Sequence, residues 1–212
     1  MHGVMLKSLG RNVHILEQAN IARVGYAAGI MAGPQVQNFL KKYDLTKQDY
    51  GIDADGVKFL NKDGSAKRII KNPYTLTSWS LLYHRLRANF DGLESQFVQK
   101  SPQVPESHGE AIYQVGKQVI DVEYLKGQVY VKYQDVTTYE ERILSADLVI
   151  AADGSNSLIR GMMMPEVQRP YAGYIAWRGT VPQEDVSKET IQFFREKLTI
   201  FISSTPRSYL LK

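Results

Sequence analysis

The stretch that decides the fold is Asp147-Leu-Val-Ile-Ala-Ala-Asp-Gly-Ser-Asn-Ser-Leu-Ile-Arg160. Residues 147–152 form an apolar run too continuous for a half-exposed strand, which is typical of a central parallel strand. Asp153-Gly154 follows as a short turn, after which the residues up to Arg160 open a helix. Ligands of open α/β sheets bind at the carboxyl ends of strands, where helix N-termini attract phosphate. The stretch therefore predicts a ligand-binding turn at the end of a buried strand.

The polar residues of this turn have two interpretations. In the functional one, Gly154 permits close approach of a ligand to the backbone, and Asp153 hydrogen-bonds sugar-like hydroxyls. Arg160 then contacts the ligand or ties the turn to its neighbours by charge-assisted bonds. In the alternative, the segment is a plain Asx-type turn, with Ser157 capping the helix and Arg160 on the surface.

The N-terminal residues resemble one half of a nucleotide-binding unit. Residues 1–9 have an apolar helical face that ends at Gly10, and residues 12–17 form a compact apolar strand closing on Glu17. In β-α-β dinucleotide-binding units, an acid about 20 residues after a G-x-G-x-x-G turn binds the ribose hydroxyls. The sequence contains no G-x-G-x-x-G, so we expect an N-terminally truncated unit. A solvated strand end is the alternative for Glu17.

The middle of the chain predicts further helices and strands. Pro34 favours a helix over residues 35–42, and Ser78 and Gly92 delimit another over residues 79–90. Residues 101–109, rich in Pro and Ser, predict a surface loop. Strands are expected in a hairpin over 57–60 and 67–70, and in an antiparallel meander over 118–125, 128–133 and 140–144.

Composition excludes several classes of function. The 212 residues include no Cys, which removes disulfides, thiolate nucleophiles and Cys-ligated zinc. The net charge of +4 comes from scattered basic residues, so no nucleic-acid footprint is predicted. The four His residues lack metal-ligand spacing, and no run of about 18 apolar residues predicts a membrane span. A cytoplasmic protein is the expectation.

The D-G stretch, residues 147–160, closely resembles the D-G motif of class A flavoprotein monooxygenases, which have the p-hydroxybenzoate hydroxylase-like fold. Residues 171–180 (YAGYIAWRGT) and 77–83 (TSWSLLY) resemble the 2,6-dihydroxypyridine 3-monooxygenase-like subgroup. The resemblance implies an α/β fold: a partial Rossmann-like FAD-binding domain with a β-meander, plus part of a mainly antiparallel substrate-domain sheet. It places residues 1–50 and 77–164 in the first domain and residues 51–76 and 165–212 in the second.

The resemblance also implies site residues. Glu17 matches the family's ribose-binding acid, Ala28 and Gly29 match the loop near the flavin, and Asp153-Gly154 with Arg160 match the D-G turn. The helix at residues 79–90 often begins with an Arg near the flavin in this family, whereas this chain has Trp79-Ser80. Arg85 and Arg87 are therefore only surface or ligand candidates, and no catalytic residue is assigned.

The implied function is hydroxylation of an aromatic or heteroaromatic substrate by FAD, with NADH or NADPH as the reductant and O2 as the oxidant. The family's downstream Gly-Asp motif would lie beyond Lys212, so truncation is expected at both ends. The alternative is a non-catalytic flavin-fold remnant or interaction protein. Neither the substrate nor the oligomeric state follows from the sequence.

Overall fold

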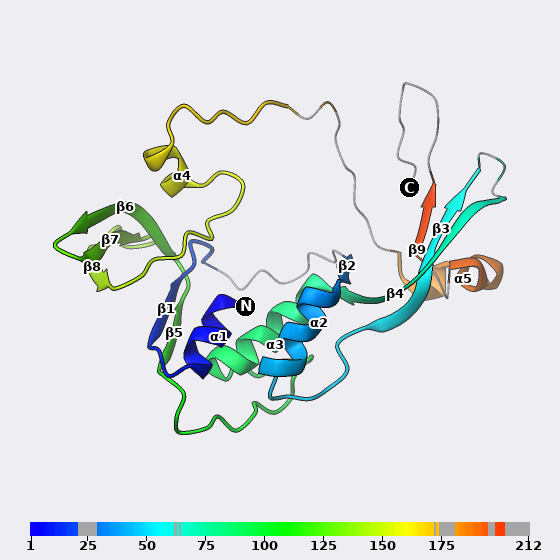
Figure 1. Cartoon of the computed structure of the whole chain (residues 1–212), viewed down its shortest axis with the longest axis horizontal. Helices are drawn as coiled ribbons and strands as arrows, with labels where there is room; N and C mark the ends of the chain where they lie inside the picture. Colours follow the sequence, from blue (N-terminus) through cyan, green and yellow to red (C-terminus); the bar gives the residue numbers. More distant parts are fainter. Residues whose placement is uncertain are drawn as a thin grey trace.

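The described chain is a mixed α/β protein with three separate sheets and several helices (Figure 1). The computed structural model describes residues 1–20, 29–61, 63, 65–171, 173, 181–194 and 198–201. Within these residues, one sheet has the order β1-β5, another β2-β4-β3-β9 and the third β6-β7-β8. The expected mixture of parallel and antiparallel pairing is confirmed.

The N-terminal helix and strand form as predicted. α1 (His2–Ser8) is followed by Gly10, whose φ of +75° is the left-handed conformation that glycine adopts readily. The chain then enters β1 (Val13–Leu16), which pairs in parallel with β5 (Ala111–Gln114). Because parallel strands end at the same edge, the residues after Leu16 and Gln114 meet there.

The longest helix, α3 (Trp79–Asp91), lies between the two ends of the molecule (Figure 1). Its predicted caps are confirmed: the Ser78 hydroxyl accepts the Leu81 N–H at 3.1 Å, and Gly92 has a φ of +76°. α2 (Pro34–Tyr43) starts at Pro34 as expected. The core around these helices includes Val4, Leu40, Ala88, Phe90 and Val98.

The second sheet contains the predicted hairpin, with longer strands than expected. β3 (Ile52–Leu60) and β4 (Ala66–Ser78) pair antiparallel, and β9 (Leu198–Phe201) adds in parallel to β3. β2 (Gly29–Ala32) pairs antiparallel with β4, opposite Ser78 at its first residue. Two short helices, η1 (Gln183–Asp185) and α5 (Lys188–Phe194), come before β9 in the chain. Figure 1 shows α5 beside this sheet.

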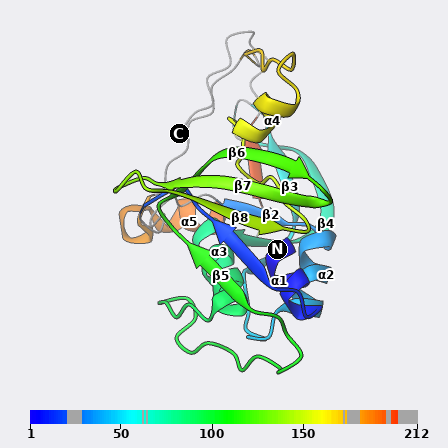
Figure 2. The same cartoon turned by 90° about the vertical axis from the view of Figure 1, so that its left-hand side faces the viewer.

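The third sheet is the predicted antiparallel meander, seen face-on in Figure 2. It consists of β6 (Lys117–Leu125), β7 (Gln128–Asp135) and β8 (Glu141–Ala146). The turn between β6 and β7 has positive φ at Lys126 (52°) and Gly127 (86°), as expected for a tight hairpin turn. At the other end of the β6-β7 hairpin, Lys117 and Asp135 form an ion pair.

The prediction of a buried parallel strand at residues 147–152 is wrong. Leu148 and Ile150 are 65% and 46% exposed, and the segment has no strand assignment. Within the described residues, β1 pairs only with β5 and β8 only with β7. A strand requires a neighbour for its backbone groups, and no described strand provides one here. The run continues instead as an extended segment into α4 (Leu158–Met163).

Candidate functional site

Glu17 lies at the carboxyl edge of the parallel pair β1-β5, where an α/β sheet binds ligands. Its backbone is fixed on both sides: its N–H donates to the Gln114 carbonyl at 2.8 Å, and its carbonyl accepts the Lys117 N–H at 2.9 Å. Its side-chain Oε1 accepts the Ala19 N–H at 2.8 Å. Among the described residues, no hydrogen bond to its Oε2 is formed.

Tyr113, on the strand paired with β1, contacts a cationic side chain of α3. The guanidinium carbon of Arg87 lies 3.6 Å from the ring centre of Tyr113 on β5. Burial raises the pKa of the Tyr113 phenol above its ordinary value, and hydrogen bonding with Tyr83 and the charge of Glu17 raise it further. The phenol therefore stays protonated beside the carboxylate at neutral pH.

The D-G turn forms and caps α4. Asp153 Oδ2 accepts the Ile159 N–H at 3.3 Å, and the Ser157 hydroxyl accepts the Arg160 N–H at 2.9 Å. The Arg160 guanidinium donates to the Ser155 carbonyl, which ties the turn to its own helix. Gly154 has a φ of +82°, and among the described residues no heavy atom beyond its two chain neighbours lies within 4 Å of where its Cβ would be. The backbone at Gly154 is thus open to close approach.

The pH dependence of this turn follows from Asp153. Burial opposes its ionisation, but hydrogen bonds from Ser157 and the Ile159 N–H lower the pKa of its carboxyl below the ordinary 3.8. A lowered folded-state pKa stabilises the turn above pH 3.8, and this contribution is lost as the pH falls through the folded value. We expect the Ile159 amide proton to titrate in NMR spectra with a midpoint below 3.8. A midpoint at or above 3.8 would contradict this, and Asp153→Asn is the control that should abolish the titration.

The remaining site residues are only partly described. Ala28 lies outside the described residues, so its predicted place near the flavin stays a prediction. Gly29 is exposed and begins β2, where it pairs with Ser78 immediately before α3. No hydrogen bond or ion pair joins Glu17, Gly29 and Asp153 within the described residues, so the structure presents them as three separate segments.

The two arginines of α3 have roles that the sequence did not distinguish. Arg85 is fully buried and is not a surface residue: it pairs with Asp44 at 3.2 Å and donates to the carbonyls of Gln48 and Asp49. Arg87 binds Asp91 through two hydrogen-bonding nitrogens and touches Tyr113. The i, i+4 spacing of Arg87 and Asp91 was the available signal for the first contact, but no local pattern indicates the second.

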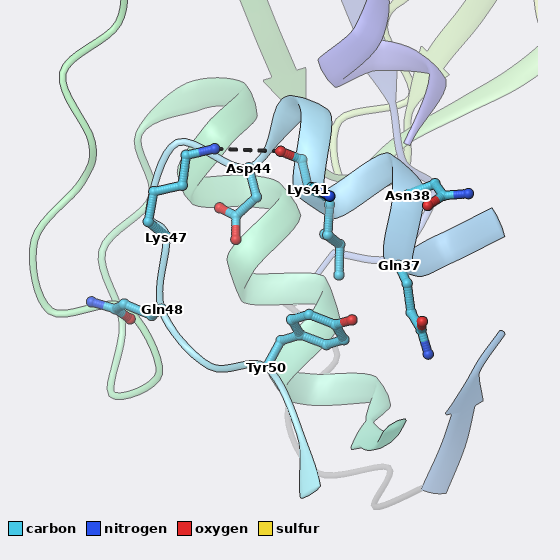
Figure 3. A pocket seen from close by; sticks show the side chains of 8 residues that line it. Gln37, Asn38, Lys41, Asp44, Lys47, Gln48 and Tyr50 are labelled. Carbon is cyan, nitrogen blue, oxygen red and sulfur yellow. Dashed lines mark hydrogen bonds between the residues drawn. The ribbon is translucent and has the colours of Figure 1, made fainter. Parts of the chain in front are cut away.

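A separate hollow of about 540 Å³ lies over α2 and the loop that follows it. Figure 3 shows polar side chains around it, with Lys47 donating to the Lys41 carbonyl at 3.5 Å. Its lining residues include Gln37, Asp44 and Tyr50 and none of the predicted cofactor residues. This hollow is therefore distinct from the cofactor site that the sequence predicts.

The described residues fit part of an FAD site. Glu17 places a carboxylate at a strand end, as a ribose requires, and Gly154 has no described side chain packed against it. The sequence has no Gly-rich phosphate turn to complete the site. Within the described residues, no cluster of three or more His, Asp or Glu could hold a metal, and no helix is both long and apolar enough to span a membrane.

The parallel strand pair that ends before Glu17, the antiparallel meander and the D-G turn belong to a chain that is similar to FAD-dependent aromatic monooxygenases. A family model described as "FAD binding domain-like" matches residues 171–211. The solved structure of 2,6-dihydroxypyridine-3-hydroxylase from Arthrobacter nicotinovorans superposes with a TM-score of 0.71 at 20% identity, covering 93% of this chain and 45% of that one. Over the covered part, the fold is therefore shared with that hydroxylase.

Curated relatives agree with the structural match. The chain is 22% identical over 197 residues to 2,6-dihydroxypyridine 3-monooxygenase from Paenarthrobacter nicotinovorans, covering 92% of this chain and 44% of the relative. It is 29% identical over 196 residues to 6-hydroxynicotinate 3-monooxygenase from Pseudomonas fluorescens, covering 89% of this chain and 46% of the relative. The chain thus spans about half the length of the curated relatives it matches.

Proposed function

We propose that this chain forms the FAD-binding part of an enzyme that hydroxylates an aromatic or heteroaromatic ring with NADH or NADPH and O2. The relatives support this by name, since both are monooxygenases named for hydroxylated nitrogen heterocycles. The observation that carries the proposal is the Glu17 carboxylate, which is fixed at the carboxyl edge of β1-β5 and whose Oε2 no described residue binds. We infer a ring of the hydroxypyridine class as the substrate.

Each site residue has a binding role in this proposal. Glu17 accepts hydrogen bonds from the adenosine ribose hydroxyls, and Asp153-Gly154 lets the cofactor approach the backbone. Arg160 fixes the turn by binding the Ser155 carbonyl, and Gly29 with Ala28 borders the flavin. When bound, FAD would supply the redox chemistry of the hydroxylation, with the nicotinamide as reductant and O2 as oxidant. The protein orients the reactants and excludes water.

The test is cofactor binding by residues 1–212 and by two matched variants. We expect the purified chain to bind FAD, detected as a flavin absorbance spectrum after titration and removal of free cofactor. Glu17→Gln should weaken FAD binding roughly 10- to 100-fold, because charged hydrogen bonds contribute about 1.5–3 kcal/mol. Glu123→Gln, at an exposed acid on β6, is the control and should leave binding unchanged.

Two results would overturn the proposal. A folded chain that stays colourless with excess FAD would favour the non-catalytic alternative. Equal FAD affinity of the wild type and Glu17→Gln would exclude the ribose role of this acid. Oxidation of NADH or NADPH stimulated by a hydroxypyridine then tests the catalytic part separately, with the reductant that is consumed identifying the nicotinamide preference.

A further inference from the structure

One face of α3 carries a continuous column of interacting side chains. Trp79, Tyr83, Arg87 and Asp91 follow one another at i, i+4 spacing, which places them on the same side of the helix. The rings of Trp79 and Tyr83 stack with centres 4.8 Å apart and planes 10° apart. Arg87 donates from Nη1 to the Tyr83 hydroxyl at 2.7 Å and from Nη2 to Asp91 Oδ2 at 2.7 Å. The guanidinium is thus held from both sides along the helix.

The column reaches the acid through a residue of β5. Tyr113 lies opposite Ile15 in the parallel pair, one position before the Gln114 carbonyl that accepts the Glu17 N–H. Its ring packs on the Arg87 guanidinium at 3.6 Å, a favourable cation–π distance. The charge of Glu17 is close enough to raise the pKa of the Tyr113 phenol, after burial and Tyr83. Tyr113 thus contacts Arg87 of α3 and pairs with Ile15, two residues before Glu17, which places the Tyr113 and Glu17 side chains on the same face of the strand pair.

We propose that Arg87 is a positioning residue for Glu17, acting through the Tyr113 ring. Asp91 and Tyr83 leave Arg87 little rotamer freedom, so its planar group is a fixed surface for the ring. The ring in turn limits where the Glu17 carboxylate lies, and its protonated phenol adds no negative charge there. This role rests on the proposed ribose-binding function of Glu17.

The test measures how strongly the chain distinguishes a ribose with hydroxyls from one without. The probes are ADP and 2′,3′-dideoxy-ADP, with dissociation constants measured by isothermal titration calorimetry. Wild type should prefer ADP roughly tenfold or more, and Glu17→Gln should lose this preference. Arg87→Met should reduce the preference several-fold, whereas a merely structural loss of folded protein would lower the apparent affinity for both ligands equally. The double variant, with both Glu17→Gln and Arg87→Met, should discriminate between the two ligands no worse than Glu17→Gln alone.

Further variants separate the parts of the column. Tyr113→Phe keeps the ring and should retain most of the preference, whereas Tyr113→Leu should lose as much as Arg87→Met. Arg87→Lys retains the charge without the planar fork and should be intermediate. Arg142→Met, at an exposed ion pair on β8, is the control. Circular dichroism melts check that each variant is folded, and the Tyr113 variants provide the test if Arg87→Met does not fold.

The outcomes distinguish this inference from the proposed function. If the wild type shows no preference for ADP, or Glu17→Gln retains it, the ribose role and the positioning role both fail. If Glu17→Gln loses the preference while folded Arg87→Met and Tyr113→Leu keep it, only the positioning role fails. Loss of the preference in all three variants, with Tyr113→Phe retaining it, supports the inference.

Discussion

Replacing Arg85 by Met should lower the free energy of unfolding by about 3–5 kcal/mol, because it leaves a buried partner charge uncompensated. Arg85 has no exposed surface, and Asp44 is only 5% exposed. Their ion pair, at 3.2 Å, joins α3 to the residue that ends α2. The guanidinium also donates to the Gln48 and Asp49 carbonyls, so it holds the loop that leads to β3.

The loss should not be recovered by other contacts of Asp44. Its Oδ1 already accepts the Asn89 amide at 2.8 Å and the Thr46 N–H at 2.9 Å, whereas Oδ2 faces the arginine. Urea unfolding followed by circular dichroism measures the change. Arg142→Met, which breaks an exposed pair with Glu140, is the matched control and should change stability by less than about 1 kcal/mol. Equal midpoints for the two variants would contradict the assigned role of Arg85.

The elements predicted correctly are those specified by neighbouring residues. The helix at 79–90 had a cap residue before it and a Gly after it, and both delimit α3. The meander had alternating strands and a Lys-Gly turn, which β6 and β7 adopt. These signals lie within a few residues of the structure they determine, so the sequence alone was sufficient.

The strand expected at residues 147–152 was wrong because its formation depends on a distant partner. An apolar run predicts burial, but a parallel strand exists only when another strand supplies hydrogen bonds along its edge. Among the described residues nothing pairs with this run, and Leu148 remains 65% exposed. Pairing between remote segments leaves no local signature.

The candidate site likewise has some features that the sequence predicted and others that it did not. The position of Glu17 after a strand and the turn at Asp153-Gly154 were visible in the sequence, although their cofactor roles remain proposals. The contact between Arg87 and Tyr113 was not visible, because it joins a helix to a strand across the intervening loop. Likewise, the burial of Arg85 follows from Asp44 on a different element.

Replacing Phe90 by Ala should also cost about 3–5 kcal/mol, because it leaves a cavity where three elements meet. Phe90 is 2% exposed. A methyl group placed on Gly3 would come within 3.1 Å of the Phe90 ring and 3.2 Å of Ile15 Cδ1, so α1 and β1 both pack closely here. Lys7 of α1 donates to the Phe90 carbonyl at 2.6 Å, which ties the same elements together.

The effect of Phe90→Ala should extend from stability to the order of the ligand-binding edge. A domain is stable by only about 5–15 kcal/mol, so the cavity removes a large fraction of that margin and loosens α1, on which β1 packs, against α3. Hydrogen exchange should show faster exchange at the β1 amides that precede Glu17, together with a lower urea midpoint. Phe90→Leu keeps most of the volume and should cost less than about 1.5 kcal/mol. Unchanged exchange in β1 despite a lower midpoint would show that Phe90 supports the helices without supporting the strand that carries the acid.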